Sequence, residues 1–253
     1  MIGMLFNTIL YRPIFNFLVF LHNIIPGHQL WLAIIILTVV IKIILLPISY
    51  QAAKSRKKQS LLQPQIKEIQ KKYKNKEEQS RELMKLYKEN KANPLSGCLP
   101  LIVQLIVVIA LYRAFMNIFK PESFSALYSF VQNPGVINVF MPFHINLSVK
   151  NYAIAIIAAI AQFFSSKMMA QYTPSSPSLA SEKQEAFQKT MQKQMIFFAP
   201  LMTLFIGMSF PSGVTFYWAI NSILELIQNS LINKEIYGKD KGKNQTNLSD
   251  NGV

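Results

Sequence analysis

Long uncharged stretches alternate with short, strongly charged segments along this chain. Residues 30–46 hold a single charge, Lys42, and the stretches 92–112, 151–166 and 194–224 hold none. A helix needs about 20 apolar residues to cross a hydrocarbon core about 30 Å thick. The stretch 194–224 is too long for one crossing, and its Phe210-Pro211-Ser212-Gly213 step is a strong turn signal. We therefore predict five membrane spans, at 29–49, 94–116, 150–170, 194–210 and 213–233.

The segments that connect these spans differ in charge, and this difference predicts the orientation of the chain. Residues 50–93 hold 13 Lys and Arg against 5 Glu, a net charge of +8. Residues 118–149 hold only Lys120 and Glu122. Because cytoplasmic loops of membrane proteins carry an excess of Lys and Arg, the segment 50–93 belongs on the cytoplasmic side. We predict a multi-pass protein of the cell (inner or plasma) membrane, with its amino terminus outside and its carboxyl terminus in the cytoplasm.

The remaining segments also carry local signals. Residues 1–28 are apolar and aromatic but are interrupted by Pro13, which favours an outer interfacial helix over a full span. A short uncleaved anchor is the alternative. In 50–93, apolar residues recur at helical spacing on both sides of Lys74-Asn75-Lys76, which indicates a cytoplasmic helical hairpin. We expect an outer loop at 117–149, a cytoplasmic loop at 171–193 and a disordered cytoplasmic tail at 238–253.

Composition narrows the class of protein. Hydrophobic residues make up 51% of the 253 residues, charged residues make up 15%, and the mean hydropathy is +0.25. Soluble domains carry about 25% charged residues, so this chain is not typical of a soluble enzyme, a disordered chain or a fibrous repeat. Cytoplasmic loops explain the formal net charge of +14 better than a nucleic-acid site does. With one cysteine, Cys98, three scattered histidines and no Gly-rich phosphate loop, the sequence predicts no metal and no cofactor.

Lys42 lies inside the first predicted span, eight residues before Tyr50. A lysine at the centre of a membrane helix costs about 2.5–3.5 kcal/mol on insertion scales, so such residues usually face protein or water. Eight helical residues extend about 12 Å, and a lysine stem covers only part of that distance to the membrane boundary. The sequence therefore favours a Lys42 that faces a hydrophilic cavity, and snorkelling to the interface is the alternative.

Polar residues also form a stripe on the last predicted span. Residues spaced three, four and three apart share one helix face, and four residues of this span have that spacing: Trp218, Asn221, Glu225 and Gln228. Glu225 and Lys42 lie at similar distances from the inner ends of their spans, so we hypothesise that they pair. Other spans contribute Thr38, Gln104 and Gln162. Together these residues predict a shared hydrophilic pocket.

Three motifs fall on these predicted elements. Lys42-x4-Pro47 ends the first span, and Asn93-Pro94-Leu95-Ser96-Gly97-Cys98-Leu99-Pro100 opens the second. Phe210-Pro211-Ser212-Gly213-Val214-Thr215-Phe216-Tyr217-Trp218 joins the last two spans. In order and spacing the motifs resemble the YidC/Oxa/Alb membrane protein insertases over about residues 10–235. The similarity is to a bacterial-type member without a large outer domain.

This resemblance implies an all-α integral membrane fold with a core of five transmembrane helices, a cytoplasmic helical hairpin and an N-terminal interfacial helix. It also implies a hydrophilic groove, closed on the outer side and open to cytoplasm and lipid. Family members usually carry arginine where this chain has Lys42, and Glu225 is a second departure from the family pattern. Tyr217 and Trp218 match the aromatic positions that guide the incoming segment. The groove and substrate-contacting residues implied are Lys42, Thr38, Gln104, Gln162, Tyr217, Trp218, Asn221 and Glu225.

The function implied is that of an insertase and chaperone. Such a protein moves short hydrophilic segments of nascent membrane proteins through the groove and releases transmembrane helices into the lipid bilayer, alone or with the Sec translocon. The signal recognition particle receptor and the ribosome are further implied partners, and we expect no specific nucleic-acid site and no enzymatic activity. Three alternatives stay open: a small ion-coupled transporter or channel using Lys42 and Glu225, an intramembrane enzyme using Lys42 as base for a serine, and a structural scaffold.

Overall fold

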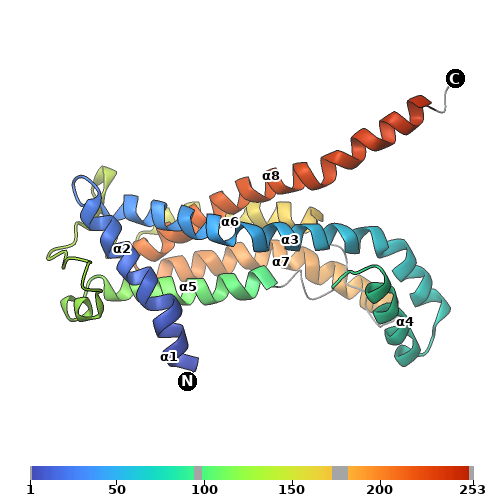
Figure 1. Ribbon diagram of the computed structural model, residues 1–253, viewed down its shortest axis with the longest axis horizontal. Coiled ribbons are helices and arrows are strands. Elements are labelled where there is room, and N and C mark those ends of the chain that lie inside the picture. Colours follow the sequence, from blue (N-terminus) through green and yellow to red (C-terminus); the bar gives the residue numbers. More distant parts are fainter. Residues whose placement is uncertain (1, 94–98, 173–181, 251–253) are drawn as a thin grey trace. The chain divides into compact units, whose positions relative to one another are not determined.

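Helices account for most of the structure, a computed structural model that describes residues 2–93, 99–172 and 182–250 (Figure 1). In chain order the elements are α1 (Ile2–Phe6), the π-helix η1 (Asn7–Tyr11), α2 (Arg12–Ile24), α3 (Leu30–Lys72), α4 (Lys76–Glu89), α5 (Leu99–Asn117), the 3₁₀-helix η3 (Pro121–Ala126), β1 (Phe140–Met141), the 3₁₀-helix η4 (Pro142–His144), β2 (Ile145–Asn146), α6 (Tyr152–Tyr172), α7 (Glu182–Ser209) and α8 (Ser212–Asp250). The two short strands pair antiparallel, with Phe140 opposite Asn146 and Met141 opposite Ile145.

The chain divides into two compact units. Unit 1 consists of Met1–Leu45, Leu101–Gln162 and Pro200–Leu224. Unit 2 consists of Leu46–Pro100, Phe163–Ala199 and Glu225–Val253. The long helices α3 and α8 each contribute residues to both units.

Three helical segments within the described part of the chain are long and apolar enough to cross a membrane. They are Gly3–Ile24, Leu30–Lys72 and Tyr152–Tyr172. Two shorter apolar helices cover Ile102–Asn117 and Ile196–Ser209. The structure therefore has the helical, multi-span character that the sequence predicts, while the count of five spans stays a prediction.

The interruption predicted at Pro13 is wrong. Helical structure runs without a break from Ile2 to Ile24, and the turn just before the proline is a π-helix, Asn7–Tyr11. The backbone N–H of Arg12 donates to the carbonyl of Asn7, five residues earlier. This wider turn accommodates a residue that has no N–H to donate and whose ring crowds the preceding turn. The segment has the length of a span, and its interfacial placement stays a prediction.

Prolines also lie inside two other helices. α3 continues through Pro47, where the sequence places the end of the first span, and through Pro64. α7 begins at Glu182, inside the predicted loop 171–193, and contains Pro200. An interior proline removes one backbone hydrogen bond and costs about 3 kcal/mol in water. Pro47 and Pro200 lie within predicted spans, where a broken helix would leave more polar backbone groups without partners, so a helix that accommodates the proline is the better solution there.

The C-terminal tail is the second place where the structure differs from the prediction. The sequence predicts disorder over 238–253, whereas α8 continues to Asp250, and residues 251–253 lie outside the described part of the chain. Starting a helix is its costly step, whereas each further residue adds a hydrogen bond to a turn that already exists. Residues that would not form a helix alone can therefore extend α8, even with Gly238 and Gly242 among them.

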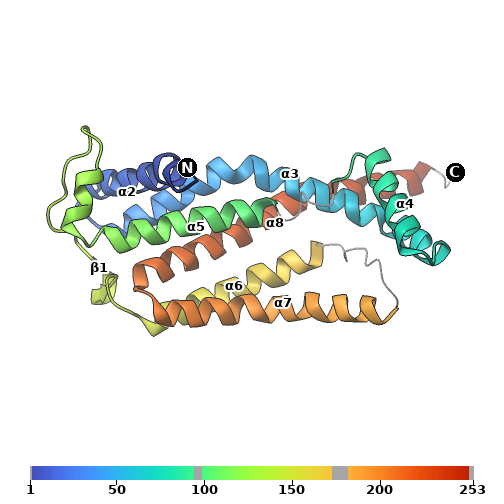
Figure 2. The same ribbon diagram turned by 90° about the horizontal axis from the view of Figure 1, so that it is seen from below.

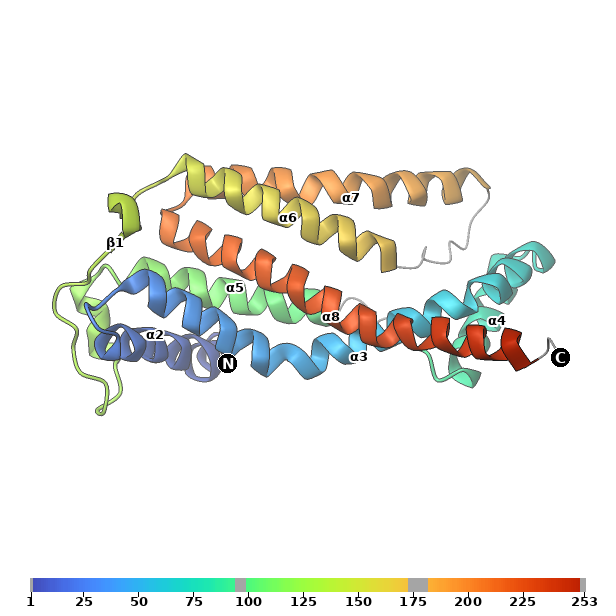
Figure 3. The ribbon, with the colours of Figure 1, turned by 90° about the horizontal axis from the view of Figure 1, so that it is seen from above.

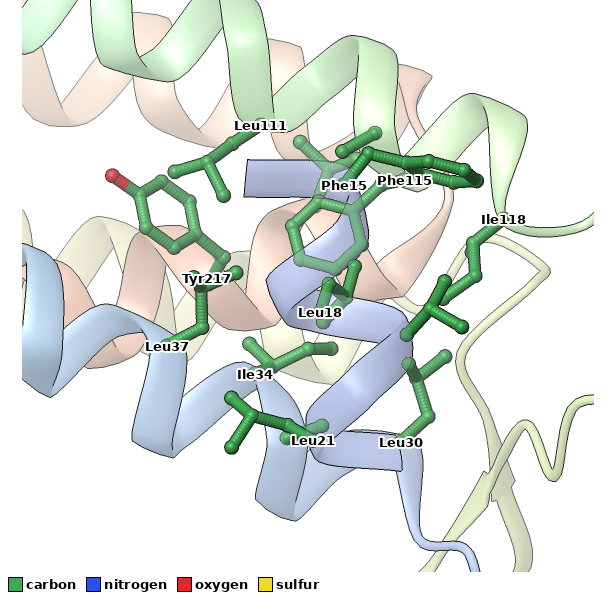
Figure 4. Close-up of a cluster of buried hydrophobic side chains, with 14 of the residues drawn as sticks. Phe15, Leu18, Leu21, Leu30, Ile34, Leu37, Leu111, Phe115, Ile118 and Tyr217 are labelled. Atoms are coloured by element: carbon green, nitrogen blue, oxygen red, sulfur yellow. The ribbon is translucent and has the colours of Figure 1, made fainter. Parts of the chain in front are cut away.

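A hydrophobic core joins α2, the first part of α3, α5 and the start of α8 within unit 1. Its fully buried members include Phe15 and Leu18 from α2, Ile34 from α3, Phe115 from α5 and Tyr217 from α8 (Figure 4). Two views of the ribbon agree that α2 and the first part of α3 lie beside α5 (Figures 2 and 3). Large apolar side chains on these faces exclude both water and lipid, and they hold the helices that carry the polar residues in fixed positions.

Unit 2 has its own smaller core between the second part of α3 and α4. Leu62 and Ile66 of α3 are buried against Leu83 and Tyr87 of α4. Burial raises the pKa of the Tyr87 hydroxyl, because a phenolate there would lose its hydration. α4 begins at an Asn75 cap, whose side-chain oxygen accepts a hydrogen bond from the backbone N–H of Glu77 at 2.9 Å.

The turn between α7 and α8 is fixed by the segment that precedes α6. The backbone N–H of Ser212 donates to Val149 O at 2.8 Å, and that of Gly213 donates to Leu147 O at 2.9 Å. Beyond the turn, the two helices approach α6 closely at Gly207. A Cβ at this position would lie 2.9 Å from Thr215 Cγ2 and 3.0 Å from Ala155 Cβ. Only a glycine allows this spacing of the three helices.

Gly207→Ala should therefore destabilise the protein by about 1–3 kcal/mol, the usual cost of overpacking a well-packed site. Gly3→Ala is the matched control, because nothing lies within 4 Å of a Cβ there and alanine is the better helix former. The free energy of unfolding in mixed micelles measures both variants. Equal stability of the two variants would contradict the close packing at Gly207.

Candidate functional site

Four side chains near the start of α8 can form hydrogen bonds, and they are arranged as two pairs. Tyr217 and Asn221 are four residues apart, and so are Trp218 and Ser222. Residues four apart lie one above the other on a helix, so each pair presents two polar groups to one neighbouring helix. A side chain from that neighbour can then reach both groups at once.

Gln104 of α5 contacts the first pair. Its Nε2 donates to the Tyr217 hydroxyl at 3.1 Å and to Asn221 Oδ1 at 3.3 Å. Tyr217 and Asn221 are both buried, and all three residues belong to unit 1. The glutamine amide therefore spans one turn of α8 and links it to α5 through neutral groups.

Gln162 of α6 contacts the second pair. Its Oε1 accepts a hydrogen bond from the Ser222 hydroxyl at 2.9 Å and a longer one from Trp218 Nε1 at 3.4 Å. Ser222 is fully buried and Trp218 is half-buried. We call the six residues of the two pairs and their glutamines the polar network: Gln104, Gln162, Tyr217, Trp218, Asn221 and Ser222.

The polar network is worth little in total stability but much in specificity. Hydrogen bonds between membrane helices contribute about 0.6 kcal/mol each on average. Four such bonds add about 2 kcal/mol, against a typical total of about 5–15 kcal/mol. Each glutamine finds two partners at only one rotation and one height of α8. The network therefore determines the register of α8 against α5 and α6.

Besides Asn221, two of the predicted site residues are buried. Thr38 is buried on α3, and its hydroxyl donates to the carbonyl of Ile34 in the same helix at 2.6 Å. A threonine that bonds to its own helix in this way has used its only donor. Tyr217 is 2% exposed, so its ring belongs to the hydrophobic core and only its hydroxyl joins the polar network.

Lys42 and Glu225 are both half-buried. Lys42 lies one turn after Thr38 on α3, and Glu225 lies one turn after Asn221 on α8. They belong to different units, and their pairing stays a prediction. Among the described residues, no group of three or more His, Cys, Asp and Glu side chains is arranged to hold a metal ion.

Ser222 is the member of the polar network that the sequence analysis misses. Serine is common in membrane helices, and its presence alone carries no signal. Its spacing does carry one, because it lies four residues after Trp218 and therefore on the same face. A search for i, i+4 pairs of hydrogen-bonding residues on this span would have found both Ser222 and its partner position.

The apolar helices, the buried core and the polar network define a multi-pass helical membrane protein whose helices are linked by side-chain hydrogen bonds. The family model for the 60Kd inner membrane protein matches residues 20–240. The chain belongs to this family, which confirms the resemblance seen in its motifs.

Relatives of known name agree with this assignment. "Membrane protein insertase YidC" of Geobacter metallireducens is 35% identical over 232 residues, which cover 90% of this chain and 38% of that protein. "Membrane protein insertase YidC 1" of Listeria monocytogenes is 32% identical over 218 residues, which cover 84% of this chain and 67% of that protein. The chain thus spans well under half of the Geobacter relative.

A solved structure shares the fold. It is described as "Active YidC insertase crystal structure with the first transmembrane domain resolved". The two chains superpose with a TM-score of 0.52 at 23% sequence identity, over 88% of this chain and 45% of that chain.

The polar network predicts a measurable effect of Gln162→Leu. This change leaves the buried Ser222 hydroxyl and the half-buried Trp218 N–H without their acceptor, and it should cost about 1–3 kcal/mol of unfolding free energy. Ile160→Leu on an exposed position of the same helix is the control and should be close to neutral. In a double-mutant cycle, Gln162→Leu and Ser222→Ala should be coupled. Additive effects would show that the two side chains do not interact.

Proposed function

We propose that this protein is a membrane protein insertase. It moves short hydrophilic segments of nascent membrane proteins part of the way across the bilayer and releases their apolar helices into lipid. The observation that carries the proposal is a lysine inside the apolar part of α3, in a chain whose α8 is polar along one face. Membership of the 60Kd inner membrane protein family and two relatives named insertases support it.

The topology proposed has five spans, formed by α3, α5, α6, α7 and α8, with the N-terminal helix in the outer interface. The Lys- and Arg-rich segment 50–93 supports a cytoplasmic position for α4, where it forms a helical hairpin with the end of α3. This places the amino terminus outside and the carboxyl terminus in the cytoplasm. The polar side chains of α8 lower its hydropathy, and this explains why composition alone does not mark it as a span.

In the proposed mechanism, the protein shortens the distance over which a hydrophilic segment must cross hydrocarbon. A hydrophilic segment that enters hydrocarbon loses its hydrogen bonds to water and finds no replacement there. A hydrophilic groove that is open to the cytoplasm and ends within the membrane would keep the segment hydrated for part of the distance. Lys42 would attract acidic residues of the segment, and the exposed part of Trp218 would guide the apolar helix that follows. Burial of apolar area in lipid, at about 25 cal/mol per Å², drives the release.

Several partners follow from this function as further proposals. The substrates are nascent membrane proteins, and the lipid bilayer receives their apolar helices. The Sec translocon, the signal recognition particle receptor and the ribosome are the candidate partners for delivery. Neither enzymatic chemistry nor a cofactor is part of the mechanism, because lipid partitioning supplies the free energy.

Lys42→Ala should slow the insertion of substrates with acidic leading segments more than that of matched neutral substrates. A charge pair at about 4 Å is worth about 1–4 kcal/mol between water and protein surroundings, so a loss of about tenfold is expected. Lys42→Arg keeps the charge and should retain activity. Ile43→Ala, at an exposed apolar position next to it, is the control. Protease protection of substrates in reconstituted vesicles measures insertion, and equal losses for acidic and neutral substrates would contradict the attraction.

The hydrophilic groove is tested separately by thiol accessibility. In a Cys98→Ser background, cysteines at 42, 104, 162 and 221 should react with a membrane-impermeant maleimide added from the cytoplasmic side. A cysteine in place of Leu105, which is exposed on α5 next to Gln104, should face lipid and stay unreactive. Lack of reaction at all four groove positions would rule out a water-filled groove.

A further inference from the structure

The segment that joins α5 to α6, residues 118–151, exposes large apolar side chains. Val136 is 92% exposed, Phe143 is 93% exposed and Phe130 is 74% exposed. Phe140 is also exposed. We call these four residues the apolar rim. Exposure of this extent in water would be unfavourable for four large side chains on one short segment, and it indicates that another apolar phase covers them.

The apolar rim is not on a loosely attached loop. Leu147, between the rim and α6, is fully buried in the core of unit 1. Backbone and side-chain hydrogen bonds attach the segment to the ends of α2, α3 and α8, and all of them lie within unit 1: Asn23 Nδ2 to Gln132 O at 2.8 Å, Asn138 Nδ2 to Gly27 O at 3.2 Å, Ser212 N to Val149 O at 2.8 Å and Gly213 N to Leu147 O at 2.9 Å. Residues 132–149 of the segment therefore lie at the level where α2 ends and α8 begins, while Ala126 is hydrogen-bonded further back on α2, to Arg12 and Asn16.

The place where helices end is the boundary of the hydrocarbon layer, and aromatic side chains are enriched there in membrane proteins. Part of the segment reaches sideways past α2 instead of continuing along the helix axes (Figures 2 and 3). A segment with this course runs along the membrane surface, over lipid. Exposed apolar side chains on it are within reach of the acyl chains.

The backbone at Phe143 points to the same conclusion. Phe143 and His144 have φ angles of +66° and +57°, in the left-handed region that residues other than glycine rarely adopt. Together with Pro142 they connect β1 to β2 and form the tip of a short antiparallel hairpin. Glycine or asparagine would be the favourable choice for such a tip in water. Phe143 has both a strained backbone and a fully exposed side chain, which would be an unfavourable combination in water.

Charge favours lipid over a protein partner as the phase that covers the rim. Residues 123–149 contain no Asp, Glu, Lys or Arg. A protein–protein contact gains specificity from a polar and charged edge around its apolar centre, and this segment offers no formal charge for that purpose. A lipid surface needs none, and it repels acidic groups when its headgroups are anionic.

We propose that the apolar rim is immersed in the interfacial layer of the bilayer and anchors the α5–α6 segment to lipid. The anchor sets the depth at which the helices of unit 1 lie in the membrane, because the segment is hydrogen-bonded to their ends. The proposal depends on the helices spanning a membrane. It does not depend on the insertase function or on which side of the membrane the segment lies.

Spin-label depth measurements test the anchor. In a Cys98→Ser background, nitroxides are attached to Phe130→Cys, Val136→Cys and Phe143→Cys, and to Ser125→Cys as an exposed polar control in the same segment. The full-length protein is reconstituted in nanodiscs of phosphatidylethanolamine and phosphatidylglycerol. Collisions with oxygen, which concentrates in lipid, are compared with collisions with a water-soluble nickel chelate. The ratio of oxygen to nickel collisions should be at least threefold higher at the three rim positions than at Ser125.

The other outcomes overturn the proposal. A ratio at the rim equal to that at Ser125 places the rim in water. Exclusion of both reagents places it against protein, and distances between labels on two molecules would then identify a second copy as the cover.

A second variant excludes an artefact of the apolar label. The label stays at Phe130→Cys while Val136→Ser and Phe143→Ser are introduced together, and Ser125→Ala serves as the matched control. Because both rim side chains are exposed, their replacement leaves the core intact. The ratio of oxygen to nickel collisions at the Phe130→Cys label should fall at least twofold with the double serine variant. It should stay unchanged with the control. An unchanged ratio would show that the native side chains do not anchor the segment.

Discussion

Hydrogen bonds between α8 and two glutamines are the interactions on which the arrangement of unit 1 depends. A polar side chain inside a membrane must find its partner within the protein, because lipid offers none. The start of α8 carries four such side chains within two turns. Gln104 of α5 is hydrogen-bonded to two of them, and Gln162 of α6 is hydrogen-bonded to the other two. The turn before α8 and the close approach at Gly207 further constrain the start of α8. Apolar packing holds the helices together, and the glutamines determine their register.

The polar face of α8 could be predicted from the sequence because helical spacing is fixed by geometry. The spacing predicts Trp218 and Asn221 on one face, but they contact different helices: Asn221 bonds to Gln104 of α5 and Trp218 bonds to Gln162 of α6, so the shared pocket stays a prediction. Gln104 and Gln162 were noted as polar residues in other spans, but their specific partners depend on how the helices rotate and pack. That information is tertiary and is not present in the periodicity of any one segment. Thr38 illustrates the limit, because a threonine in the predicted face can bond to its own helix instead.

The ends of the helices were the least predictable feature of the fold. The sequence predicts an interruption at Pro13, yet helical structure continues from Ile2 to Ile24. A proline does not end a helix here for a physical reason. The helix loses one hydrogen bond at the proline, whereas a break in lipid would leave several backbone groups without partners and cost more. The tail of α8 was misjudged because an existing helix can extend into residues that would not start one.

Beside its apolar core, unit 1 buries several polar side chains and exposes several large apolar ones, and this distribution constrains the proposed mechanism. Ser222 and Asn221 are buried, while Ile43 and Phe143 are exposed. A carbonyl oxygen has two lone pairs, and Gln162 Oε1 uses them for Trp218 and Ser222. Gln162 Oε1 therefore has no acceptor capacity left for a substrate, and the polar network mainly links its own helices. In the proposed insertase, it would serve as a fixed wall, and the interactions that stabilise a passing hydrophilic segment would come from water and from the charge of Lys42.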